Sequence, residues 1–196
     1  MSRSNEIVMG RLGELAQIKS GASIRGKIEI DPEGETFLIQ QGDINLNGIS
    51  GELKRIHHLK IDRDRLQNGD VLLRSKGTPT VAAEFIKTGG LPIVAAPAVL
   101  ILRLGQDSML PAFLTWIINS EWGQKVLTGR RTGRHIPVIP RKALEDIVIP
   151  VPSLDEQRAI CELSTLAKRH EQLASQYREK IDSLLVAKSM GAAFDE

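Results

Sequence analysis

The sequence is poor in cysteine and aromatic residues, and it contains no long apolar run. Cys161 is the only cysteine among 196 residues, so a disulfide within the chain is excluded and a reducing cytoplasm is the expected setting. Aromatic residues make up 4% of the chain, which predicts an aliphatic core. No segment reaches the roughly 18 apolar residues of a membrane-spanning helix, and the polar N-terminus lacks the apolar region of a signal peptide.

Sequence signatures of catalysis are missing as well. There is no phosphate loop ending in Gly-Lys-Ser/Thr, no Gly-x-Gly-x-x-Gly and no Asn/Asp-Pro-Pro-Tyr of amino-methyltransferases. His57 and His58 are adjacent, so on a strand they point to opposite faces and cannot hold one metal ion. The spacing of Asp43, Glu52 and Lys54 faintly resembles that of restriction nucleases, but a polar glycine-bearing loop supplies it by chance. We therefore expect a non-catalytic chain without a metal.

The charge is unevenly distributed along the chain. The net charge is only +2, yet residues 125–142 contain six Lys or Arg and no Asp or Glu. Such a local excess is typical of surfaces that bind polyanions, although a solvated face on a basic protein is the alternative. Gly129 and Gly133 lie on either side of Arg130-Arg131-Thr132, and they favour the first interpretation because glycine lets the backbone approach a phosphate closely.

Two further segments are rich in hydrogen-bond donors. The loop that begins at Arg74 contains an arginine, a lysine and hydroxyl groups. The arginine guanidinium can donate two hydrogen bonds to guanine, and the other groups can contact phosphates or bases. The alternative is an ordinary polar turn. A second such loop contains Lys19, Arg25 and Lys27, and we expect all three loops on one face of the domain. His135 could contact a phosphate or a base edge. The candidate DNA-binding residues are Lys19, Arg25, Lys27, Arg74, Ser75, Lys76, Thr78, Arg130, Arg131, Thr132, Arg134 and His135.

Residues 1–152 have the pattern of a mixed α+β domain with a twisted sheet. Apolar and alternating segments predict strands at 37–41, 71–74, 81–87, 99–104 and 147–151. A short helix or turn is expected at 12–17. Near Pro111, apolar residues recur with the spacing of one helix face. These residues are Leu110, Phe113, Leu114, Ile117 and Ile118.

Residues 153–196 are predicted to form a long helix followed by a short tail. Pro150 and Pro152 favour extended backbone before it, and Ser153 with Glu156 has the spacing of a capping box. Apolar or small residues then alternate steps of three and four, which is typical of a coiled-coil seam. The seam residues are Ile160, Leu163, Ala167, His170, Ala174, Tyr177, Ile181 and Leu184. We interpret Cys161 as a small packing residue beside this seam.

The helix start, Val-Pro-Ser-Leu-Asp-Glu-Gln-Arg-Ala-Ile at 151–160, resembles the start of the conserved helix in type I restriction–modification specificity subunits. Residues 11–21 resemble the opening of their target-recognition domain. Residues 37–44 and 66–77 resemble its central strands, and residues 132–136 its closing strand region. The resemblance implies a target-recognition domain at 1–152 and a spacer and dimerisation helix at 153–196.

Full-length members of this family resemble two such units in tandem, so one unit of each kind implies a half-size subunit that self-associates through its helix. The resemblance also implies a separate methyltransferase subunit, which binds S-adenosylmethionine and modifies adenine. A nuclease-translocase subunit is a further implied partner, and this chain itself would hold no cofactor. Two alternatives stay open: a stand-alone DNA-binding regulator or competitor of a restriction system, and a specificity module detached from a fused restriction–methyltransferase enzyme.

Overall fold

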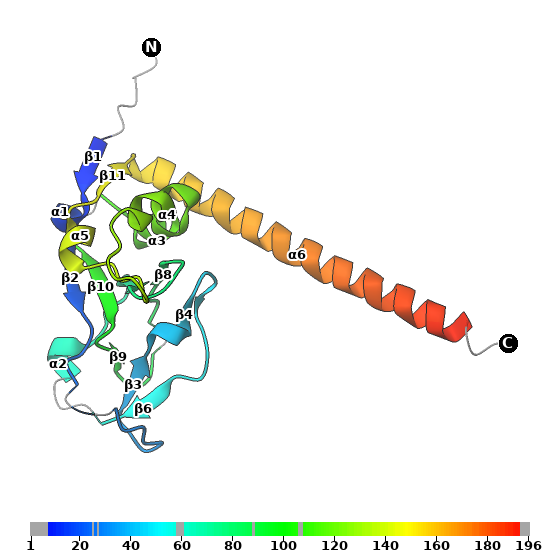
Figure 1. Cartoon of the computed structure of the whole chain (residues 1–196), viewed down its shortest axis with the longest axis horizontal. Coiled ribbons are helices and arrows are strands. Elements are labelled where there is room, and N and C mark those ends of the chain that lie inside the picture. The colour runs from blue at the N-terminus through cyan, green and yellow to red at the C-terminus, as the bar shows by residue number, and fades with distance from the viewer. Residues whose placement is uncertain are drawn as a thin grey trace, which may run out of the picture. The chain divides into compact units, whose positions relative to one another are not determined.

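The computed structural model describes residues 8–24, 26, 28–57, 61–87, 89–105 and 108–192, drawn in colour in Figure 1. The chain forms two compact units, Met1–Gln157 and Arg158–Glu196. The first unit contains all the described strands and the shorter helices, whereas the second is a single helical segment. The predicted combination of a mixed α+β domain and a long C-terminal helix is confirmed.

The centre of the first unit is an antiparallel sheet with the strand order β2-β10-β7-β8. Its strands are β2 (Ala16–Ser20), β10 (Val99–Leu104), β7 (Val71–Arg74) and β8 (Val81–Glu84). Three residues of β7 and four of β10 are buried, so both strands have the continuous apolar character of a sheet covered on two faces. The strand predictions at 71–74 and 99–104 are confirmed.

A second sheet has the order β6-β3-β9, with β3 and β9 parallel. It consists of β6 (Lys54–Ile56), β3 (Thr36–Ile39) and β9 (Ile93–Ala95). The short strands β4 (Ile44–Asn45) and β5 (Gly48–Ile49) form a hairpin. An aliphatic core joins these elements, as the low aromatic content predicted. One cluster of this core contains Ile39, Ile44, Leu66, Leu72, Val81, Ala83, Phe85, Ala95, Val99 and Ile101.

Helix α3 (Pro111–Asn119) packs against β8, and α4 (Glu121–Thr128) follows it after one residue. Pro111 occupies the first turn of α3, where a missing N–H costs nothing. Gly123 permits the tight packing of the two helices, because a Cβ there would lie 2.0 Å from the Ile117 carbonyl oxygen. The predicted apolar face of α3 is confirmed by the burial of Phe113, Leu114, Ile117 and Ile118.

The remaining short elements surround this body. They are α1 (Leu12–Leu15), α2 (Ile61–Asp64), the 3₁₀ turn Gln41–Asp43, and α5 (Arg141–Glu145). Strand β1 (Val8–Arg11) pairs with β11 (Val148–Val151) in a separate antiparallel ribbon.

Three predicted boundaries differ from the structure. The helix expected at 12–17 ends at Leu15, because Ala16–Ser20 joins the central sheet by pairing with β10. The strand expected at 37–41 ends at Ile39, where the chain enters the 3₁₀ turn. The strand expected at 81–87 ends at Glu84.

Helix α6 runs from Leu154 to Ala192 over 39 residues, which corresponds to about 58 Å. Its capping box is present. The Ser153 N–H donates to the Glu156 carboxylate at 2.9 Å, and the Glu156 N–H faces the Ser153 hydroxyl at 3.4 Å. Among the residues that the structure describes, no helix is both long and apolar enough to cross a membrane.

Candidate nucleic-acid interface

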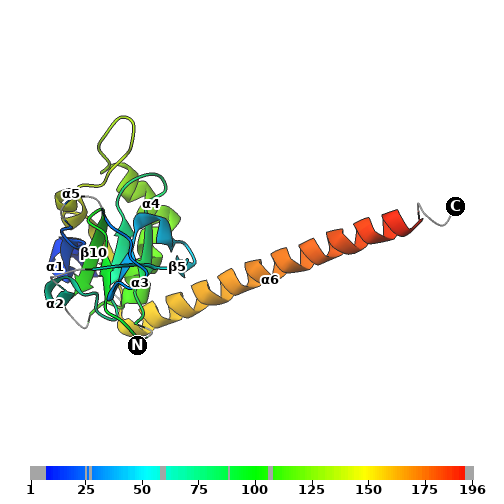
Figure 2. The ribbon, with the colours of Figure 1, turned by 90° about the horizontal axis from the view of Figure 1, so that it is seen from below.

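The structure brings two of the three predicted loops together. The loop that follows β7 and the segment between α4 and α5 are joined by a bridge between Lys76 and Val138. The Gly77 N–H also donates to the Pro137 carbonyl at 2.9 Å. Figure 2 shows the segment between α4 and α5 projecting from the body of the domain. Donor-rich stretches that lie more than fifty residues apart in sequence therefore form one surface.

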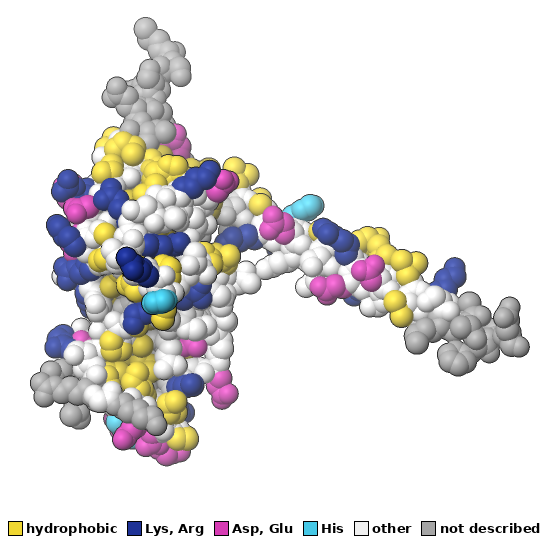
Figure 3. Space-filling view, in the orientation of Figure 1, with side chains coloured by type: hydrophobic (Ala, Val, Ile, Leu, Met, Phe, Trp, Pro, Cys, Tyr) yellow, Lys and Arg dark blue, Asp and Glu magenta, His cyan; other side chains and the backbone are white. Residues whose placement is uncertain are grey.

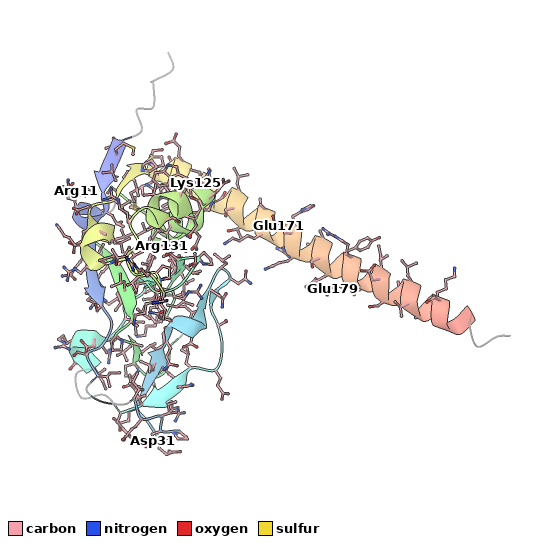
Figure 4. The ribbon with its side chains drawn as sticks, in the orientation of Figure 1. Arg11, Asp31, Lys125, Arg131, Glu171 and Glu179 are labelled. Atoms are coloured by element: carbon pink, nitrogen blue, oxygen red, sulfur yellow. The ribbon has the colours of Figure 1, made fainter. Side chains whose placement is uncertain are left out.

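Arg131 fixes the base of the projecting segment. Its Nη2 donates to the Thr80 hydroxyl at 3.1 Å and lies 3.5 Å from the Gln124 side-chain oxygen, while its Nε is buried without a partner. Thr80 is fully buried and directly precedes β8. Figure 4 labels Arg131 among the side chains of the first unit. Arg131 therefore joins the two loops from inside, and its guanidinium is less accessible than an exposed phosphate contact requires.

Side chains from α3 and α4 hold the outer edge of β8. The Asn119 amide accepts from the Ala82 N–H at 2.9 Å and donates to the Ala82 carbonyl at 2.8 Å, as a neighbouring strand would. Gln124 donates to the Thr80 carbonyl at 2.7 Å. These hydrogen bonds cover the edge of β8, whose backbone N–H and carbonyl groups would otherwise be unpaired. The same bonds fix α4, and hence the start of the projecting segment.

The local charge of the 125–142 segment is smaller than the sequence suggests. Lys125 pairs with Glu121 at 2.7 Å, Arg141 with Glu145 at 2.6 Å, and Lys142 lies 3.9 Å from Glu145. These acids lie just outside the segment and follow helical spacing, so they pair with its ends. The unpaired charge is concentrated in the middle.

Arg130 and Arg134 carry that charge. Both are exposed, and neither has an acidic partner in the described parts of the chain. Thr132 and His135 are exposed beside them, with Thr132 paired to Val138. The expected role of glycine holds at Gly133, whose φ of +96° favours glycine, but Gly129 has the ordinary helical φ of −68°.

The loop after β7 contains both exposed and buried candidates. Lys76 and Thr78 are exposed, whereas Ser75 is 6% exposed and donates to the Ala98 carbonyl at 3.0 Å. Ser75 is thus a structural residue in this conformation, not the exposed donor that we expected. Arg74 donates through Nη2 to the Pro79 carbonyl at 3.1 Å.

Lys19 lies on strand β2 and not in a loop as we expected. Its neighbour Arg103 donates from Nε and Nη2 to the buried Asp70 carboxylate, both at 2.7 Å. Burial, and then the nearby Arg103 charge, lower the pKa of Lys19 from its usual value. Arg25 and Lys27 lie outside the described residues. Because Ser20 and Arg74 pair with adjacent residues of β10, the chain leaves β2 and β7 at the same end of the sheet.

The described residues contain no group of three or more His, Cys, Asp or Glu side chains that could hold a metal ion. His57 lies 3.1 Å from Asp31 near the surface, and His58 falls outside the described residues. The Glu33 backbone N–H and then His57 lower the pKa of Asp31. We interpret this as a surface pair.

One feature of this surface was missed by the sequence analysis. The β4–β5 hairpin lies next to the loop after β7, and its residues line an open groove of about 500 Å³ together with Arg74. The Asn47-Gly48 dipeptide between Ile44 and Ile49 is a hairpin signal that could have located it.

Figure 3 shows how charged side chains are distributed on one face of the first unit. Lys and Arg lie over its upper and middle part, whereas Asp and Glu gather at the end near β6, where Glu33 and Glu52 are exposed and Asp31 is half-buried. This uneven distribution favours an anion-binding surface around the two loops.

The predicted seam residues of α6 are largely exposed in the single chain. Leu163 is 66% exposed and Leu184 is 69% exposed, and Tyr177 and Ile181 are also exposed. Leu166, Leu173 and Leu185 widen the apolar stripe. Figure 3 shows that apolar side chains lie along the surface of this helix. An apolar stripe of this length favours burial against a partner.

Comparisons with solved structures show a shared fold. The HsdS subunit from Thermoanaerobacter tengcongensis aligns with a TM-score of 0.62 at 18% identity, covering 88% of this chain and 45% of that one. The S subunit of a type I restriction–modification system from M. genitalium aligns with a TM-score of 0.54 at 19% identity, covering 89% and 43%. This chain therefore spans less than half the length of these proteins.

Sequence comparison identifies the family. The specificity subunit of the type I restriction enzyme MjaVIII from Methanocaldococcus jannaschii is 29% identical over 133 residues, which cover 62% of this chain and 31% of that protein. The profile described as "Type I restriction modification DNA specificity domain" matches residues 5–182. Because that match covers most of the sequence, the chain belongs to the type I restriction modification DNA specificity domain family, whose members specify DNA sequence and are not the catalytic subunits.

Proposed function

We propose that the first unit of this chain binds duplex DNA sequence-specifically and directs a methyltransferase to its site. The observation that carries this proposal is the joined pair of loops, on which Arg130 and Arg134 are exposed without acidic partners in the described chain. Exposed arginines on a projecting segment suit contacts with the phosphate backbone, which position the protein.

Within this surface, different residues have different roles. We assign phosphate contacts to Arg130, Thr132, Arg134 and His135. Lys76 and Thr78 lie on the adjoining loop and contact the backbone or base edges, and Arg74 reads a base. Arg25 and Lys27 remain proposed contacts, because the loop after β2 starts at the same end of the sheet.

The family and the exposed seam of α6 support a proposal about the partners. The exposed seam binds a second copy of this chain, and the assembly binds a methyltransferase that uses S-adenosylmethionine to modify adenine. A nuclease-translocase subunit completes the restriction form of the complex. The complex acts in the cytoplasm, where this chain contributes sequence recognition and no chemistry.

Deletion of the gene tests this proposal. We expect adenine methylation to disappear from one sequence motif in the host genome, and a methyltransferase to co-purify with the tagged chain. An unchanged methylation pattern, with DNA binding retained by the purified chain, would instead identify a stand-alone regulator. If the purified chain does not bind DNA, both the proposed function and the stand-alone regulator are overturned.

A further inference from the structure

The β4–β5 hairpin and Arg74 line the same open groove. The hairpin pairs Ile44 with Ile49 and Asn45 with Gly48, so Leu46 and Asn47 form its two-residue tip. The groove of about 500 Å³ is lined by both tip residues, by Asn45 and Ser50 from the hairpin, and by Arg74, Pro79 and Val81.

The tip is held rigidly by its own hydrogen bonds. The Asn45 side chain accepts from the Asn47 N–H at 2.9 Å and donates to the Ser50 hydroxyl at 2.5 Å. Both functional groups of Asn45 are thus used within the hairpin. The side chain of Asn47 is exposed, and Leu46 is 52% exposed. A preorganised tip presents side chains to a ligand with little loss of entropy on binding.

Among the described residues, Arg74 uses few of its hydrogen-bond donors. An arginine side chain has five N–H groups, and among the described residues Arg74 has one hydrogen-bond acceptor, the Pro79 carbonyl, and no acidic partner. Its Nε is buried without a partner. The Pro79 bond fixes the guanidinium at the edge of the groove. Because Nε is buried, the remaining N–H groups of the two terminal nitrogens are the ones that a planar acceptor pair in the groove would bind.

We propose that Asn47, Leu46 and Arg74 form a base-reading groove of this chain. The chemistry matches adjacent base pairs in the major groove. Asparagine pairs with the N6 and N7 atoms of adenine, an apolar side chain contacts the thymine methyl, and arginine pairs with O6 and N7 of guanine. The groove therefore recognises an A·T pair close to a G·C pair. This inference rests on the proposed function and adds the hairpin tip as its specificity-determining element.

The position of the groove supports this role. Lys76, two residues after Arg74, is bridged to Val138 on the segment that carries Arg130 and Arg134. Phosphate contacts by that segment would set the register of the duplex, and base contacts beside it would carry the sequence information.

Selection from duplex DNA with a randomised central segment tests the groove, using the chain as purified from its host. We expect Asn47→Ala to relax the preference at one base pair by roughly 5- to 150-fold, the range of one good base contact. Arg74→Lys keeps the charge but loses the pair of guanidinium N–H groups that binds one base. It should relax the sequence preference at a neighbouring base pair by a similar factor.

Matched controls exist elsewhere in the same unit. Arg55 also donates to a proline carbonyl, that of Pro32, and Asn68 is an exposed asparagine outside the groove. Arg55→Lys and Asn68→Ala should leave the selected motif unchanged. A wild-type motif that survives both groove substitutions overturns this inference alone, as does a uniform loss of affinity for all sequences. A wild-type chain that enriches no sequence overturns the proposed function as well.

Discussion

The side-chain oxygen of Gln157 accepts a hydrogen bond from the Leu110 N–H at 2.8 Å, which attaches the first turns of α6 to the start of α3. The Gln157 amide nitrogen donates to the carbonyls of Ser108 and Pro152, both at 2.8 Å, and the residue is fully buried. One side chain thus satisfies three backbone groups. It holds the first turn of α6 within the first unit.

Gln157→Ala should therefore destabilise the first unit. The substitution removes all three bonds and leaves buried groups unpaired, and we expect a loss of about 2–4 kcal/mol in the free energy of unfolding. Urea unfolding measures it. Gln172→Ala, at an exposed position of the same helix, is the control and should change stability little. Equal stability of the two variants would contradict the anchoring role.

The sequence predicted the features that depend on local chemistry. The capping box of Ser153 and Glu156, the long helix after it and the apolar face of α3 follow from spacing alone. The strand Ala16–Ser20 was missed although Ala16 and Ile18 alternate with polar residues, because it directly follows an apolar helical turn and pairs with residues about eighty positions away.

The candidate site was predicted as a set of charges but not as an arrangement. Segment composition pointed to Arg130 and Arg134, but it could not show that Arg131 turns inward to Thr80 or that Ser75 is buried. Those outcomes depend on which strand edge each loop meets. Acidic residues just outside the segment also neutralise part of its charge, as Glu121 does for Lys125. A count of charges within the segment does not include these residues.

Arg131 and Arg134 should respond differently to the same conservative change. Arg131→Lys keeps the charge but cannot reproduce the contacts with Thr80 and Gln124, so we expect DNA affinity to fall roughly fivefold, about 1 kcal/mol for a lost hydrogen bond. Arg134→Lys should bind nearly as the wild type does. Hydrogen exchange at the Val138 N–H, which donates to the Thr132 carbonyl, should accelerate only in Arg131→Lys. Equal behaviour of both variants would assign Arg131 to direct DNA contact.

The salt dependence of DNA binding should identify the phosphate contacts. Each contact releases counterions and contributes about 0.9 to the slope of log affinity against log salt. Replacing Arg130 and Arg134 together by alanine should therefore reduce the slope by about 1.8. Lys125 and Arg141 are paired with Glu121 and Glu145, so the corresponding double alanine variant is the matched control. A larger change in the control would place the DNA along the helices that flank the segment.

The seam of α6 should control assembly without affecting the fold of the first unit. Replacing Leu163 and Leu184 by glutamate introduces charge where burial of each leucine would contribute about 1.5–3 kcal/mol. Light scattering should then show a monomer, while circular dichroism and thermal unfolding of the first unit stay unchanged. Gln176→Glu, which lies off the seam on the same helix, should remain assembled. A monomeric wild-type chain, or an assembled double variant, would contradict self-association through this seam.

The symmetry of a dimer predicts the form of its DNA target. Two copies related by a two-fold axis present the same reading surface twice, so the target should be an inverted repeat separated by base pairs that neither copy reads. Single-molecule sequencing of methylated adenine in the host, with and without the gene, measures this motif directly. Two halves of different sequence would indicate that a second, different specificity chain pairs with this one through α6. A single unrepeated motif would mean that one copy acts alone with its methyltransferase, and the exposed seam would then be the surface that binds that subunit.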